Sequence, residues 1–253
     1  MDAIKLIVGD VSTLPEGGEV REVLEFLGQN LSKILEEFIF VGAQDSSRVV
    51  MYAPFLARSF LEVSLTALAG RMDPFRLLSI RRIQKSPDYD RSIAWKAAMR
   101  WSGDVVSEMP TGDPWTHKLD PQSMSRAVLG HFYNDLLWLP ALQRLSDFSS
   151  SLTDGGGQWL AEIVGRPPQA FCSTKRGTVN ALYSELSKSV HFEGVVPLVI
   201  PDRVTVVDLV NKSIREVAEL ALVVSFMEHP MSRMGAGAAL NLFNEFESME
   251  VIS

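Results

Sequence analysis

Apolar residues at intervals of three and four positions fill the first part of the sequence, directly after the Gly17-Gly18 turn. An α-helix has 3.6 residues per turn, so this spacing places apolar side chains along one face of a long amphipathic helix. A helix with such a face has to bury it against other elements, which makes a multi-helix bundle the expected architecture. The residues of this stripe are Val20, Val23, Leu24, Leu27, Leu31, Ile34, Leu35 and Phe38.

Capping signals predict where further helices begin. Asp45, followed by two serines, can cap a helix that runs towards Gly70. The pairs Asp73-Pro74 and Asp120-Pro121 each combine a capping side chain with proline at the first helical position. Helical patterns also cover residues 173–191, 208–227 and 232–247.

Two short valine-rich runs are the one strand-like pattern in the chain. Val195–Ile200 and Arg203–Val207 flank Pro201-Asp202, a pair typical of turns. We therefore predict an all-α protein, a multi-helix bundle, with one small β-hairpin at these residues.

The stretch 149–157 reads Ser-Ser-Ser-Leu-Thr-Asp-Gly-Gly-Gly, a composition that suits a linker or an exposed loop. It divides the chain into a predicted N-terminal helical lobe, 1–148, and a predicted C-terminal lobe with the hairpin, 158–253. A single domain with an exposed loop at 149–157 is the alternative.

Composition excludes several classes of protein. The 253 residues include four histidines and one cysteine, Cys172, so no internal disulfide or cysteine-rich zinc site can form. There is no His-x3-His or Cys-x2-Cys pair, and we expect neither a metal nor a cofactor. The most apolar window, Ala218–Met227, is short and contains Glu219, so we predict no membrane-spanning segment and no membrane partner. A cytoplasmic location is expected.

Positive charge is concentrated in one segment. The chain has a net charge of −7, but Arg71–Arg100 holds eight basic and three acidic residues. Arg81 and Arg82 lie in its middle, and phosphate binding requires clustered cations of this kind. We predict that any nucleic acid or acidic partner binds here, with Trp95 and Trp101 available for base stacking. A solvated helix face with two core tryptophans is the alternative.

Arg126 and His131 stand on the helix predicted after Asp120-Pro121, with four residues between them. The pair resembles the R-x4-6-H motif of the HEPN superfamily of all-α nucleotide-binding and ribonuclease domains. The resemblance implies metal-independent RNA cleavage, in which His131 moves protons and Arg126 stabilises the phosphate. A histidine that titrates near neutrality and a guanidinium that matches phosphate suit this chemistry. The polar residue common after the arginine is Ala127 here, and a surface arginine beside a partly buried histidine is the alternative.

Steps of four residues place Tyr183, Ser187 and His191 along one side of a helix. This polar row resembles the Tyr-x2-Leu-Ser-x3-His helix of several uncharacterised bacterial helical families, some of them HEPN-like. It is either a binding row or a partly buried support, in which Ser187 and His191 bond to each other and hold the hairpin against the bundle.

Two hypotheses about function follow. The first is a component of a prokaryotic defence or toxin system that acts on or senses nucleic acid, in the form of a HEPN-like ribonuclease. The second is a non-catalytic helical interaction or regulatory subunit of a larger complex. Under either hypothesis we expect a protein partner or a homo-oligomer.

Overall fold

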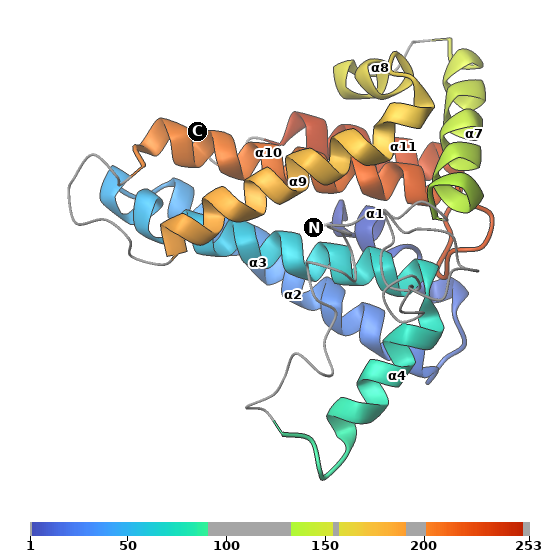
Figure 1. The fold of residues 1–253 in the computed structure, drawn as a ribbon, viewed down its shortest axis with the longest axis horizontal. Coiled ribbons are helices and arrows are strands. Elements are labelled where there is room, and N and C mark those ends of the chain that lie inside the picture. The colour runs from blue at the N-terminus through green and yellow to red at the C-terminus, as the bar shows by residue number, and fades with distance from the viewer. Residues whose placement is uncertain (1, 91–132, 154–156, 191–200, 250–253) are drawn as a thin grey trace, which may run out of the picture.

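The computed structural model describes residues 2–90, 133–153, 157–190 and 201–249. These residues form nine α-helices, a short 3₁₀ helix at Val11–Thr13 and a π-helical turn at Asn134–Trp138, and contain no strand. The all-α class is thereby confirmed for the described ranges (Figure 1). The helices are α1 (Ile4–Val8), α2 (Glu19–Gly42), α3 (Ser46–Met72), α4 (Pro74–Lys85), α7 (Leu139–Ser150), α8 (Gln158–Val164), α9 (Pro168–Val190), α10 (Arg203–Ser225) and α11 (Ala236–Ser248).

The predicted stripe of residues 20–38 is the buried face of α2. Leu24, Leu31, Leu35 and Phe38 are fully buried, and α2 packs along α3. Helix α3 begins where its predicted cap places it. The Asp45 carboxylate accepts hydrogen bonds from the backbone N–H groups of Ser47 and Arg48, at 3.0 and 3.2 Å. Asp73 caps α4 in the same way, at 3.0 Å.

Helix α3 is the centre of the bundle. It packs against α2, α9 and α10, with its most extensive contact to α10 (Figure 1). Helices from both sides of residues 149–157 contribute side chains to one hydrophobic cluster. The apolar stretch of α10, Val217–Ser225, is buried within it.

Helix α3 is also long and apolar enough to cross a membrane by length and composition. Its best 18-residue window has a mean hydropathy of 1.2, and 44% of that window is buried inside the bundle. The sequence pattern predicted no such segment. Part of this composition comes from the buried side of α3, which packs against α2, α9 and α10.

The predicted β-hairpin is wrong in its second half. Arg203–Val207 forms the first turns of α10, and the Asp202 carboxylate accepts a hydrogen bond from the N–H of Thr205 at 2.8 Å. Asp202 is therefore a helix cap, not part of a β-turn. A short valine-rich run fits a buried helix as well as a strand, which explains the error. The predicted first strand, Val195–Ile200, lies outside the described residues.

Candidate functional site

The structure describes four of the predicted site residues, Tyr183, Ser187, Arg81 and Arg82. Arg126 and His131 fall in 91–132, and His191 falls in 191–200, so these three lie outside the described residues. The ribonuclease pair and the last member of the polar row stay predictions.

The Tyr183 hydroxyl joins α9 to α3. It accepts a hydrogen bond from Nη2 of Arg58 at 2.7 Å and donates one to Oε1 of Glu62 at 3.0 Å. The Arg58 guanidinium also lies 4.7 Å from the centre of the Tyr183 ring. Burial, helped by the Glu62 carboxylate, raises the pKa of Tyr183, so the phenol stays protonated at neutral pH.

The Ser187 hydroxyl bonds within its own helix. It donates to the backbone carbonyl of Tyr183 at 2.7 Å, and both side chains are half-buried. In the described part of the polar row, Tyr183 joins α9 to α3, and Ser187 bonds to the backbone of its own helix. The predicted bond between Ser187 and His191 involves a residue outside the described ranges and stays a prediction.

Tyr183→Phe should lower the free energy of unfolding by about 1–2 kcal/mol, because both the Arg58 and the Glu62 bonds to the hydroxyl are lost. Tyr52→Phe is the matched control, since Tyr52 is exposed on α3. Urea unfolding of the two variants tests this. An unchanged midpoint for Tyr183→Phe would show that the contact contributes nothing to stability.

Arg71, the first cation of the basic segment, is fully buried. Its Nη1 donates to the carbonyls of Leu6 and Ile7 at 3.0 and 3.1 Å, and its Nε donates to the carbonyl of Met231 at 3.2 Å. It therefore binds the end of α1 and the chain between α10 and α11. Arg71 is therefore not available to a partner that binds at the Arg71–Arg100 segment.

Arg81 and Arg82 have different roles. Arg81 donates to the backbone carbonyl of Glu19 at 2.5 Å and forms an ion pair with the Glu22 carboxylate. The hydrogen bond that Arg81 donates to the Glu22 carboxylate lowers the pKa of Glu22. Arg82 and Lys85 are exposed on α4. Of the predicted binding pair, Arg81 holds α4 to α2 and Arg82 faces solvent.

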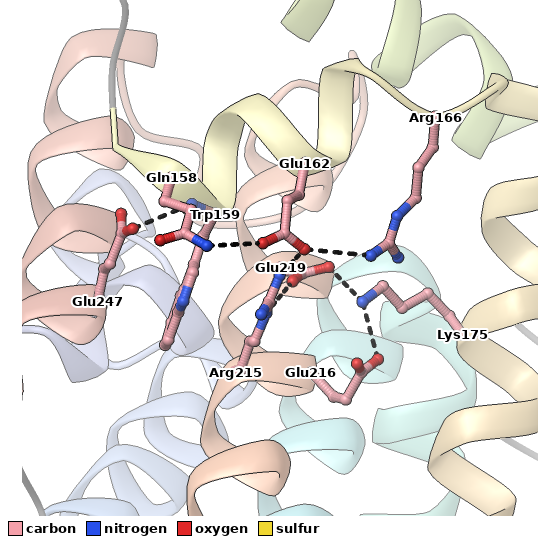
Figure 2. Close-up of polar contacts among 9 residues, drawn as sticks. All are labelled: Gln158, Trp159, Glu162, Arg166, Lys175, Arg215, Glu216, Glu219 and Glu247. Atoms are coloured by element: carbon pink, nitrogen blue, oxygen red, sulfur yellow. Dashed lines mark hydrogen bonds and ion pairs between the residues drawn. The ribbon is translucent and has the colours of Figure 1, made fainter.

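A buried ion network between α8, α9 and α10 is the largest feature that sequence reasoning missed (Figure 2). Lys175, with 1% of its side chain exposed, donates to Oε2 of Glu216 at 2.8 Å and pairs with Glu219, which is 2% exposed. The Arg215 Nε lies 2.7 Å from Oε1 of Glu219. Lys175 is thus paired with two carboxylates, and Arg215 shares one of them, Glu219.

Glu162 extends the network to α8. It forms ion pairs with Arg215 and with Arg166, the latter at 3.3 Å. The Arg215 guanidinium lies 5.4 Å from the Trp159 ring, and the backbone N–H of Trp159 donates to the Glu247 carboxylate of α11 at 3.0 Å (Figure 2). These contacts therefore fix the short helix α8 against α10 and α11.

Positive and negative groups balance in this network, which holds three cations and three carboxylates: Arg166, Lys175, Arg215, Glu162, Glu216 and Glu219. Burial raises the pKa of Glu216, and Lys175 partly offsets this effect. Within the described ranges no group of histidine, cysteine and carboxylate side chains is arranged to hold a metal ion. The arrangement suits a structural support.

Cys172 is a buried free cysteine on α9. Burial raises the pKa of its thiol to about 12, so the thiol is protonated at neutral pH. Since the thiolate is the reactive form, Cys172 is a poor nucleophile.

An apolar groove of about 520 Å³ lies between α2 and α4. Phe26 on its α2 side is 62% exposed, an unusual fraction for a phenylalanine. Val23, Leu27, Leu77 and Ile80 form the apolar lining, Thr66 of α3 adds to it, and Glu22, Arg81, Gln84 and Lys85 supply the polar groups.

Helix α4 projects away from the other helices (Figure 1). Its 12 residues contain four cations and no carboxylate. Phe75 at its start is 84% exposed, and Ile83 near its end is exposed as well. Neither Phe75 nor Ile83 lines the groove, to which α4 contributes Leu77, Ile80, Arg81, Gln84 and Lys85. We call the groove together with the exposed residues of α4 the α2/α4 surface.

Comparison of the chain with known proteins finds no matching family model, no matching curated protein and no matching solved structure. The resemblance to HEPN proteins at Arg126–His131 and Tyr183–His191 therefore stays a prediction. The groups described above are the basis for any proposal about function.

Proposed function

We propose that the chain is a helical interaction subunit that binds a protein partner through the α2/α4 surface. The observation that carries this proposal is the open apolar groove beside the exposed ring of Phe26. Contiguous apolar surface that the fold does not cover is typical of binding sites, whereas single exposed apolar residues are ordinary.

The contrast between polar groups that are paired within the chain and groups that are exposed supports the same proposal. Arg71, Lys175 and Tyr183 are bound to groups within the chain, where they connect helices. Arg82, Lys85 and Phe75, all on α4, are in contrast exposed. Helix α4 thus presents exposed cations and an exposed aromatic ring together, although exposed apolar side chains also occur on α2, α3 and α10.

The proposal predicts that the native protein is part of a complex that depends on α4. In extracts of cells that express it from its own locus, the chain should elute by size exclusion well above its own 28.1 kDa. Phe75→Glu should shift it to the position of the free chain, because a buried, unpaired carboxylate opposes binding. Val204→Glu is the matched control, since Val204 is an equally exposed apolar residue on α10. Elution of the wild type as a free chain would contradict the proposal.

The ribonuclease hypothesis makes a different prediction for the isolated chain. Under it, purified protein cleaves RNA in the presence of a chelator, and His131→Ala abolishes cleavage without loss of helicity. The interaction proposal expects no such activity. If the protein cleaves RNA without metal and His131→Ala abolishes this cleavage, the interaction proposal is wrong. The ribonuclease hypothesis, with its role in a defence or toxin system, then takes its place.

A further inference from the structure

We infer that the α2/α4 groove binds an amphipathic helix of the partner, with a row of apolar anchors flanked by carboxylates. This inference rests on the proposed function and adds the chemistry of the partner. A helix laid into an apolar groove is a common mode of peptide recognition, in which side chains at i, i+3 or i+4 and i+7 act as anchors.

The lining of the groove suits apolar anchors. Val23 and Leu27 on one wall face Leu77 and Ile80 on the other. Thr66 is the one α3 residue among the described lining, and its hydroxyl donates to the backbone carbonyl of Glu62 at 2.7 Å. Its polar atom is therefore already satisfied, so an apolar anchor loses no hydrogen bond there.

The walls are held at a fixed separation before any partner binds. Arg81 links α4 to the Glu19 carbonyl and the Glu22 carboxylate of α2. Leu77 packs directly on Gly70 of α3, where an added Cβ would lie 2.9 Å from the leucine side chain. A preformed groove binds more tightly than one that must first be ordered.

Charge around the groove selects carboxylates on the partner. On the α2 side, Glu25 is paired with Arg21 at 2.7 Å, and Glu22 is paired with Arg81. Lys85 and the neighbouring Arg82 remain exposed on the α4 side. In the described lining of the groove, Arg81 and Lys85 are cations and Glu22 is the one carboxylate, which leaves an excess of one positive charge on a chain whose net charge is −7. Complementary charge favours an acidic segment and disfavours a basic one.

Two labelled peptides of about 15 residues test this inference with the full chain. Both carry leucines at i, i+4 and i+7, and they differ only in whether glutamate or lysine flanks the leucines. In fluorescence anisotropy the glutamate peptide should bind at least about tenfold more tightly than the lysine peptide. Lys85→Glu should remove or invert this preference, because it reverses the charge at the rim.

Phe26→Glu should abolish binding of the glutamate peptide while the circular dichroism spectrum stays unchanged, since the ring is exposed. Phe40→Glu is the matched control, because Phe40 is equally exposed near the other end of α2. Equal affinity for the two peptides, or binding that survives Phe26→Glu, would overturn the inference. A wild-type dimer that Phe26→Glu converts to a monomer would also overturn it, by showing that the occupant is a second copy.

The two proposals can fail separately. If Phe75→Glu dissociates the native complex but neither peptide binds, the chain is an interaction subunit and the partner chemistry is wrong. If the glutamate peptide binds but the native chain elutes alone, the groove binds an acidic amphipathic helix as inferred, and the proposed function is wrong.

Discussion

Lys175→Met is expected to lower the free energy of unfolding by about 3–5 kcal/mol, because it leaves the largely buried Glu216 carboxylate without its paired cation and Glu219 with Arg215 alone. Lys175 Nζ is the shared partner of Glu216 and Glu219, and the side chain of Lys175 is almost completely enclosed. Lys188→Met is the matched control on the same helix, since Lys188 pairs with Glu185 in solvent. The control should change stability by no more than about 0.5 kcal/mol.

Removal of the two carboxylates should restore most of the lost stability. A buried ion pair replaced as a whole by apolar residues of similar size is often neutral, whereas half of a pair is costly. Lys175→Met combined with Glu216→Leu and Glu219→Leu should therefore be more stable than Lys175→Met alone in urea unfolding. If the free energy of unfolding of Lys175→Met lies within about 1 kcal/mol of the wild-type value, water reaches the network.

The loss in Lys175→Met should depend on pH. Burial raises the pKa of Glu216 above its usual 4.5, so the folded chain binds this proton more tightly than the unfolded chain does. For such a group, stability is greatest below the unfolded pKa and falls as pH rises through the folded pKa. Without Lys175 this fall becomes larger, so the deficit of the variant should shrink as the pH is lowered towards 4.5.

Arg71→Met is expected to cost at least about 3 kcal/mol, because the carbonyls of Leu6, Ile7 and Met231 lose their donor inside the protein. Arg82→Met is the matched control from the same segment and should be nearly neutral, since Arg82 is exposed. Equal unfolding midpoints for the two variants would contradict the assignment of Arg71 as an internal support.

The loss in free energy of unfolding caused by Arg71→Met should be constant around neutral pH, unlike the loss caused by Lys175→Met. Burial lowers the pKa of Arg71 to about 10, so the guanidinium is charged in both the folded and the unfolded chain at pH 7. Urea unfolding at several pH values separates the two variants. A deficit that changes between about pH 6 and 8 would show that other titrating groups depend on Arg71.

Local signals in the sequence were sufficient to predict α2, α3, α4 and most of α9, α10 and α11, but not α1, α7 or α8. The stripe of residues 20–38 and the caps at Asp45 and Asp73 depend on neighbours within four positions, and the structure confirms them. The Arg203–Val207 strand failed because a five-residue run contains too little periodicity to separate strand from helix. Asp202, a helix cap, carried the signal that could have corrected it.

The sites depend on contacts between distant residues, which local patterns do not contain. Lys175 stands in the apolar stripe of α9 with Phe171 and Val179, and Glu219 stands in an apolar window of α10. A charged residue inside the apolar face of a helix is a signal that it has a buried partner. The sequence does not show that Lys175 and Glu219 are partners of each other, because 44 positions separate them. Arg71 was counted as surface because net charge is summed along a segment, whereas burial is decided by the packing of α1 and α3.

Hydrogen exchange of the full chain, with and without the glutamate peptide, tests the central claim most directly. The account holds that the polar clusters of α9 and α10 support the fold and that the α2/α4 surface binds the partner. Slower exchange on peptide binding should be confined to α4 and to Glu19–Leu27 of α2. Protection on the Tyr183 side of α9, or no protection in α2 and α4, would contradict the account.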